Sequence, residues 1–277
     1  MNRKPNRAFC APTLGALLMM ALLITTARAQ DYGDTPYVQT PQNVVDKMLD
    51  VAKVGPKDYV IDLGSGDGRM VITAAQRYGA KGFGVDLDKR LVTLSNRLAH
   101  KAGVADRAVF YERDIYETDL SPASVVTIYL LPEVNLMMRP KLLAMLKPGT
   151  RIVSHDYDLG EWPPDLTFTM DAPGKTVGRD KKSKVFYWVV PGRVAGKWRW
   201  RSAAEGGPAR DFELALTQMF QKVEGTLSVE GKTVPIEDAN LVGESLTFAA
   251  RLDASGPARY EFNGRIINHA IEGTVRT

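Results

Sequence analysis

Three glycines alternate with polar residues in the stretch Gly64-Ser-Gly-Asp-Gly68, which directly follows the apolar run Tyr59–Leu63. The run is typical of a buried parallel strand, and a segment with helical periodicity, Met70–Tyr78, begins soon after the glycines. A strand, a glycine turn and a helix start place exposed backbone N–H groups where a ligand can approach them closely. The stretch therefore predicts a binding site for a nucleotide-like cofactor.

Two cofactor classes fit such a loop. The dinucleotide fingerprint G-x-G-x-x-G needs a third glycine three positions after the second, and that position holds Arg69. The pattern Asp-x-Gly-x-Gly-x-Gly instead resembles motif I of the class I S-adenosylmethionine (SAM)-dependent methyltransferases, whose loop holds the methionine end of SAM. The resemblance implies that SAM is the cofactor and is contacted by Asp62, Gly64, Ser65 and Gly66.

Acidic residues close the next two predicted strands. Asp86 ends Lys81–Asp86 and follows Gly66 by 20 residues, where α/β nucleotide sites place a carboxylate for the ribose hydroxyls. The alternative role, capping the next helix, suits Asp88 better. Asp114 ends the strand predicted over residues 108–114, and by resemblance it accepts a hydrogen bond from the adenine amino group. Carboxyl ends of parallel strands share one sheet edge, so we expect these groups to face one pocket.

A short segment, Tyr37-Val-Gln-Thr-Pro41, leads into a helix predicted over residues 41–54. Thr40 is a candidate N-cap with Pro41 in the first turn. In the resembled family a similar segment covers bound SAM. The resemblance therefore adds Tyr37 and Thr40 to the expected cofactor contacts.

The fourth strand, predicted over residues 123–131, ends in Tyr129-Leu-Leu-Pro132 at the position of family motif IV. In amino-methylating members a related turn presents a backbone carbonyl to the acceptor nitrogen, which implies roles for Tyr129 and Leu130. The leading Asp or Asn of Asp-Pro-Pro-Tyr is absent, which argues against DNA-adenine methylation. With the following Glu133-Val-Asn135, the turn resembles a small group of protein-lysine methyltransferases that includes mitochondrial members, over residues 37–162.

Ser154-His-Asp-Tyr-Asp158 follows the fifth predicted strand at the same expected edge. Asp156 is the candidate group to position or deprotonate an acceptor amine, and Tyr157 is a candidate wall of the acceptor pocket. A metal site at His155 is not predicted, because the other two histidines are distant in the chain and a hydrogen-bonded loop histidine is the commoner case.

Two further strands, residues 166–170 and 184–190, are expected to close the sheet as an antiparallel pair. Between them lies a basic loop, expected to be solvated, with contact to an acidic substrate as the alternative: Lys175, Arg179, Lys181, Lys182 and Lys184. Residues 30–191 are thus predicted to form an α/β domain, a Rossmann-like seven-stranded methyltransferase sheet with helices on both faces.

From Val194 onward short alternating runs are separated by glycine-containing turns. This pattern predicts an antiparallel meander, folded as a small sandwich or barrel over residues 192–277. We find no catalytic cluster in it, which favours a binding, docking or stabilising module.

The first 29 residues have the organisation of a secretory signal. Arg3, Lys4 and Arg7 precede the apolar run 14–24, and Ala27-Arg28-Ala29 forms a cleavage site before Gln30. We expect the cleaved protein to be periplasmic or secreted and not bound to a membrane; an uncleaved anchor is the alternative. The only cysteine, Cys10, lies in this leader, so a mature chain has neither disulfides nor cysteine ligands.

The net charge of +4 arises in the same leader. It contains four basic residues and no acidic one, so its removal leaves 36 − 4 = 32 basic residues against 32 acidic ones. This balance gives no support to a nucleic-acid partner.

Three functions remain open at this point. The first is a SAM-dependent methyltransferase that N-methylates an amine, with protein lysine favoured, by in-line transfer. The second is an exported protein that binds a nucleoside without catalysis, because SAM is not expected outside the cytoplasm. The third is an NAD(P)-dependent oxidoreductase, disfavoured by Arg69 and by the lack of a Tyr-x-x-x-Lys pair. The residues indicate neither the individual acceptor nor the oligomeric state.

Overall fold

The computed structural model describes residues 37–203, 209–252, 259–267 and 270–276. The predicted signal peptide, residues 1–29, lies outside this range. Among the described residues, no helix has the length and apolar character needed to span a bilayer.

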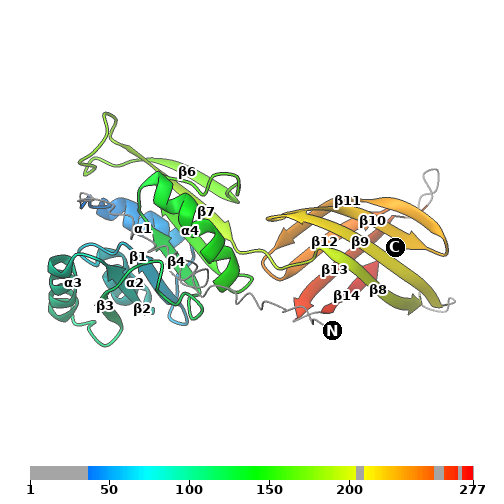
Figure 1. Cartoon of the computed structure of the whole chain (residues 1–277), viewed down its shortest axis with the longest axis horizontal. Helices are drawn as coiled ribbons and strands as arrows, with labels where there is room; N and C mark the ends of the chain where they lie inside the picture. The colour runs from blue at the N-terminus through cyan, green and yellow to red at the C-terminus, as the bar shows by residue number, and fades with distance from the viewer. Residues whose placement is uncertain (1–36, 204–208, 253–258, 268–269, 277) are drawn as a thin grey trace, which may run out of the picture. The chain divides into compact units, whose positions relative to one another are not determined.

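A mixed seven-stranded sheet occupies the first part of the chain, in the order β3-β2-β1-β4-β5-β7-β6 (Figure 1). β1 to β5 pair in parallel, whereas β7 runs antiparallel to both β5 and β6. This arrangement confirms the predicted Rossmann-like sheet. The strands are β1 Tyr59–Leu63, β2 Lys81–Asp86, β3 Ala108–Glu112, β4 Val125–Ile128, β5 Arg151–His155, β6 Leu166–Asp171 and β7 Lys182–Val189.

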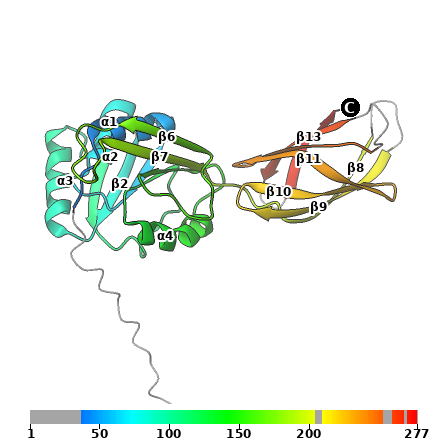
Figure 2. The same cartoon turned by 90° about the horizontal axis from the view of Figure 1, so that it is seen from above.

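Helices cover both faces of this sheet. α1, α2 and α3 lie on one face, and α4 lies on the opposite face (Figure 2). Asp88 caps α3 by accepting a hydrogen bond from the Arg90 backbone N–H (2.8 Å), as its position predicted. The helices are α1 Gln42–Val51, α2 Arg69–Tyr78, α3 Lys89–Lys101 and α4 Pro132–Met145.

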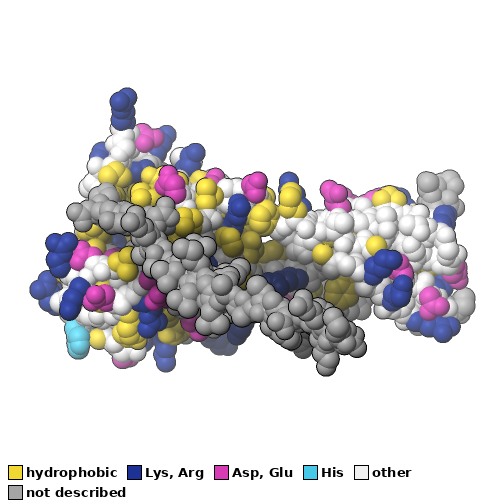
Figure 3. All heavy atoms as spheres, in the orientation of Figure 1, with side chains coloured by type: hydrophobic (Ala, Val, Ile, Leu, Met, Phe, Trp, Pro, Cys, Tyr) yellow, Lys and Arg dark blue, Asp and Glu magenta, His cyan; other side chains and the backbone are white. Residues whose placement is uncertain are grey.

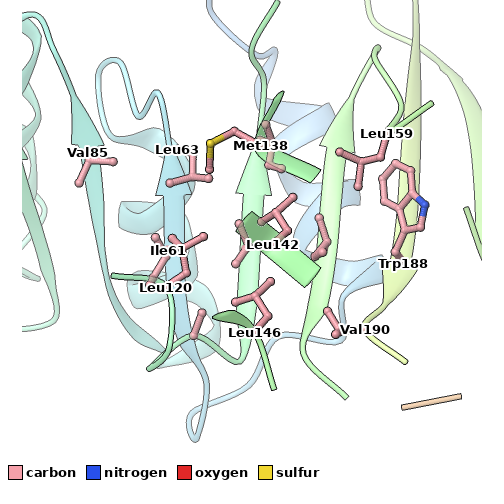
Figure 4. Close-up of a cluster of buried hydrophobic side chains, with 14 of the residues drawn as sticks. Ile61, Leu63, Val85, Leu120, Met138, Leu142, Leu146, Leu159, Trp188 and Val190 are labelled. Carbon is pink, nitrogen blue, oxygen red and sulfur yellow. The ribbon is translucent and has the colours of Figure 1, made fainter. Parts of the chain in front are cut away.

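The core between α4 and the sheet fixes the position of β1, which the glycine loop follows. Met138 and Leu142 of α4 are fully buried and project toward Ile61 and Leu63 of β1 (Figure 4). Burying side chains of this size contributes about 1.5–3 kcal/mol each. Because β1 carries the glycine loop at its carboxyl end, this packing fixes where the loop begins.

A second seven-stranded sheet, curled and wholly antiparallel, forms the C-terminal part of the described chain. It is a simple meander in which each strand pairs with the next, which confirms the antiparallel prediction. Its two edges are formed by its first and last strands. The strands are β8 Gly196–Ala203, β9 Ala209–Met219, β10 Lys222–Val229, β11 Lys232–Val242, β12 Ser245–Ala250, β13 Tyr260–Ile267 and β14 Ala270–Arg276.

Two local predictions were wrong. Thr40 does not cap α1: Pro41 occupies the cap position without a side-chain hydrogen bond, and the Thr40 hydroxyl contacts His155 instead. Asp114 is not the last residue of β3, which ends at Glu112. The Asp114 carboxylate accepts a hydrogen bond from the Tyr116 N–H (2.8 Å) in the turn after β3.

Candidate functional site

The glycine loop lies at the carboxyl end of β1 and adopts a backbone that only glycine tolerates easily. Gly64, Gly66 and Gly68 have φ angles of 74°, 54° and 80°. A Cβ on Gly68 would lie 2.5 Å from the Phe110 ring, so a side chain there would also clash. The three glycines therefore let the backbone turn tightly and remain accessible to a ligand.

Asp86 faces this loop from the end of β2. One carboxylate oxygen accepts a hydrogen bond from Gly66 N–H and the other from Asp88 N–H, both at 2.9 Å. Each oxygen has a further lone pair, which leaves capacity for two hydroxyl donors. The carboxylate thus has the direction and the free acceptor sites that ribose binding requires.

Asp114 lies near the same edge, one residue after Arg113, whose N–H donates to the Asp86 carbonyl (3.1 Å). This bond joins the chain beyond β3 to the end of β2. The Asp114 carboxylate accepts a hydrogen bond from Tyr116 N–H and keeps further acceptor capacity, and the expected adenine contact at Asp114 stays a prediction.

Asp62 in β1 and Ser65 within the loop are both buried. The Asp62 carboxylate accepts a hydrogen bond from the Thr127 hydroxyl (2.6 Å), and burial raises its pKa to about 7. The Ser65 hydroxyl packs beside Gly84 and has no hydrogen-bond partner among the residues that the structure describes. The SAM contact expected at Ser65 stays a prediction.

Leu130 and the segment before α1 border the loop on other sides. A Leu130 methyl carbon lies 2.6 Å from where a Gly64 Cβ would be, so the side chain covers the loop directly. Tyr37 is 42% exposed, whereas Thr40 is buried. The Thr40 hydroxyl lies 3.2 Å from His155 Nδ1, which connects this segment to the end of β5.

Aromatic rings gather where β4 and β5 end. The Tyr129 ring lies 4.0 Å from the His155 ring and 6.3 Å, stacked, from Tyr157, measured between centroids. Burial raises the pKa of the Tyr129 phenol to about 12, so it stays protonated at neutral pH. His155 is fully buried between Thr40 and Ser183, and desolvation lowers its pKa to about 4. It is a neutral hydrogen-bonded histidine, as expected.

Asp156 has a strained backbone, with φ of 60°, and such residues cluster at functional sites. One carboxylate oxygen accepts a hydrogen bond from Lys184 N–H (3.0 Å), and the other lies 2.7 Å from the Lys175 ammonium. The expectation of a solvated loop was wrong for Lys175, whose side chain is only 11% exposed. Asp156 therefore already binds one primary ammonium group.

Two contributors were not recognised from the sequence. Asn135, fully buried in α4, donates from its amide to Ser154 Oγ and the Tyr157 carbonyl, both at 3.1 Å, and so fixes the loop after β5. Arg69 was noted only for breaking the dinucleotide pattern, yet its guanidinium contacts the Thr40 carbonyl (2.8 Å). Neither contact has a sequence signal, because both partners are distant in the chain.

Taken together, these groups define a nucleoside site of the SAM-methyltransferase type. The glycine backbone and the remaining acceptor capacity of Asp86 fit the amino-acid and ribose parts of SAM, and the uncharged Leu130 lies beside them. Within the described residues, no group of three or more His, Cys, Asp or Glu side chains is placed to hold a metal ion.

Comparison with known proteins defines the family. The ANTKMT methyltransferase domain model matches residues 62–166. A protein-lysine N-methyltransferase of Saccharolobus islandicus is 45% identical over 130 residues, which cover 47% of this chain and 81% of that enzyme. The adenine nucleotide translocase lysine N-methyltransferase of mouse is 33% identical, with 47% of this chain and 56% of that protein covered. The chain therefore belongs to the class I SAM-dependent methyltransferases, in the family that includes the Saccharolobus enzyme.

A solved structure supports the cofactor. The crystal structure of an RNA methyltransferase from Salinibacter ruber, in complex with S-adenosyl-L-homocysteine, is 46% identical. The matched region covers 57% of this chain and 96% of the Salinibacter chain, with a TM-score of 0.51. SAM is thus the cofactor of this methyltransferase, as predicted. This chain matches only about half of the length of the mouse relative.

Proposed function

We propose that this methyltransferase N-methylates a primary amine, and that the amine is a lysine side chain of a protein. The observation that carries the proposal is the 45% identity to the Saccharolobus protein-lysine N-methyltransferase across 81% of that enzyme. The geometry agrees with it, because Asp156 already binds the primary ammonium of Lys175 beside the Tyr129 and Tyr157 rings.

The chemistry assigns different tasks to the two sides of the site. SAM, when bound, supplies a methyl group that is already activated for transfer. The chain has to hold the acceptor in line with it, and orientation of this kind is worth about 7–11 kcal/mol. The acceptor amine has to be neutral when it attacks, so Asp156 is proposed to orient it and take its proton. A backbone carbonyl at Leu130 or Leu131 is the proposed second contact to the amine.

Lys175 bears on the same step. Its ammonium occupies one oxygen of Asp156, so an acceptor amine has to displace or share this contact. The rings of Tyr129 and Tyr157 offer apolar faces to a desolvated cation or amine. These contacts favour a long, flexible amine over a bulky planar acceptor.

RNA is the second candidate acceptor, because the Salinibacter structure is described as an RNA methyltransferase. The charge balance favours protein over RNA, because residues 30–277 contain 32 basic and 32 acidic residues. Among the described side chains visible in Figure 3, basic and acidic groups are interspersed. Nucleic-acid binding normally uses a continuous basic surface.

The test is a methylation assay with labelled SAM on protein and RNA fractions of a cell extract, followed by mass spectrometry. Methyl-lysine in protein supports the proposal, whereas label confined to RNA would refute it.

Asp156→Asn is expected to lower turnover about 100-fold at unchanged SAM affinity. The matched control is Asp158→Asn, since the Asp158 carboxylate only accepts a hydrogen bond from Gly160 N–H (3.0 Å).

We also propose that residues 1–29 direct the chain out of the cytoplasm and are cleaved off during export. The basic start, apolar run and Ala27-Arg28-Ala29 site support this. N-terminal sequencing of protein from fractionated cells provides the test. A chain starting at Gln30 outside the cytoplasm supports export, and an intact leader in the cytoplasmic fraction contradicts it.

A further inference from the structure

An arginine at the start of α2 joins the glycine loop to the segment before α1. Arg69 Nε donates to one carboxylate oxygen of Asp67 (2.9 Å), and Nη2 contacts the other (2.5 Å). Nη1 of the same guanidinium donates to the Thr40 backbone carbonyl (2.8 Å). We call Asp67, Arg69 and the Thr40 carbonyl the Arg69 latch.

The paired contacts within the Arg69 latch fix the orientation of its side chains. A planar guanidinium that meets a carboxylate with two N–H groups fixes the orientation of both partners. The Asp67 side chain is 11% exposed and that of Arg69 26%, so solvent screens the pair less than it screens a surface ion pair. Asp67 thereby orients Nη1 of Arg69 toward the Thr40 carbonyl.

The same segment is tied down at a second point. The Thr40 hydroxyl contacts His155 Nδ1 (3.2 Å), and the other ring nitrogen of His155 contacts the Ser183 hydroxyl (2.8 Å). The Gln39 amide also reaches Asp67, at 3.4 Å. Residues 39 and 40 are therefore held between the glycine loop on one side and the end of β5 on the other.

We propose that Arg69 is a positioning residue for SAM, which acts by fastening residues 38–41 against the glycine loop. Asp67 lies inside the loop, between Gly66 and Gly68, so the fastened segment borders the cofactor site. A binding site whose walls are ordered beforehand loses less conformational entropy when the ligand binds. The inference rests on the SAM site alone and is independent of the acceptor.

The test variant is Arg69→Gln, which keeps the side chain as far as Cδ but removes the positive charge and the paired N–H groups that meet Asp67. Calorimetry should show about tenfold weaker binding of SAM and of S-adenosylhomocysteine, as expected when a charged hydrogen bond is lost. Turnover at saturating SAM should stay within about twofold. Hydrogen exchange at the amides of residues 38–40 should become faster. Arg77→Gln is the matched control, because Arg77 lies on the same helix in a solvent-exposed pair with Asp46.

A double-mutant cycle with Asp67→Asn separates the latch from direct cofactor contact. If Arg69 acts through the latch, the double variant should bind SAM no more weakly than Arg69→Gln alone. Additive losses with unchanged exchange at residues 38–40 would overturn the proposal, as would unaltered affinity in Arg69→Gln. Should Arg69→Gln fail to fold, Asp67→Asn alone is expected to show the same exchange change and weaker SAM binding. Failure to find a lysine acceptor would leave these measurements unaffected.

Discussion

The two sheets of the molecule differ in where their strands end. In the first sheet, five parallel strands bring their carboxyl ends to one edge, and Asp86, the glycine loop and Tyr129 follow three of these ends. In the second sheet each strand reverses the direction of the one before, so successive carboxyl ends fall on opposite edges. The comparison teaches that parallel strands concentrate polar groups at one place, whereas a meander disperses them.

The side chains of the second sheet reflect this difference. Its apolar face is built from stacked aromatics, such as Trp200 on Phe212 (5.0 Å between centroids) and Phe248 on Phe262 (4.4 Å). Charged residues pair across neighbouring strands at the surface, as Arg199 does with Glu213 (2.7 Å). The matched family model covers only residues 62–166, within the first sheet. A binding, docking or stabilising role for residues 192–277 stays a proposal.

The largest expected effect tests whether the second sheet contributes to the cofactor site. Phe212 is buried in the aromatic stack, and Phe212→Ala is expected to cost about 3–5 kcal/mol in the free energy of unfolding. The affinity for SAM, measured by calorimetry on the folded variant, should not change. Met219→Ala on the same strand is the control, because Met219 is 61% exposed. Weaker SAM binding by folded Phe212→Ala would show that the second sheet also contributes to cofactor binding.

The second prediction concerns the first sheet. Asp86→Ala removes the carboxylate expected to accept the ribose hydroxyls, so SAM affinity should fall about 100-fold in calorimetry. Asp106→Ala alters an exposed carboxylate before the amino end of β3 and should leave the affinity unchanged. Near-normal binding by Asp86→Ala would show that the ribose is held elsewhere.

The smallest expected effect is a pH dependence. Burial raises the pKa of Asp62 from 3.8 to about 7, so the folded state retains a proton that the unfolded state releases. This contribution to stability is complete below pH 3.8 and is lost as pH rises toward and through 7. Between pH 5 and 7 the loss should amount to about 2 kcal/mol. Asp62→Asn should remove it, as measured by urea unfolding of both proteins; identical pH profiles would contradict the assignment.

Much of the fold and of the cofactor side could be predicted from the sequence, because local patterns determine them. The glycine loop, the strand before it and the Asp88 cap are encoded within a few residues, and Asp86 follows the loop at a fixed spacing. The parallel order of the strands follows from alternating strands and helices.

Contacts between distant residues could not be predicted in this way. Arg69 reaches Thr40 across 29 positions, and Lys175 pairs with Asp156, from which strand β6 separates it in the chain. The same limit explains the failed cap at Thr40, since a tertiary partner, His155, took its hydroxyl. Sequence patterns report local preference, and they cannot show which preference a long-range contact overrides.

The two hydrogen bonds that Asp86 accepts from Gly66 and Asp88 have a practical consequence for ligand discovery. They connect the loop after β1 to the segment before α3 through one carboxylate. Fragment-sized nucleoside analogues could therefore be screened for binding at the glycine loop and Asp86. Such a screen would not require the methyl acceptor.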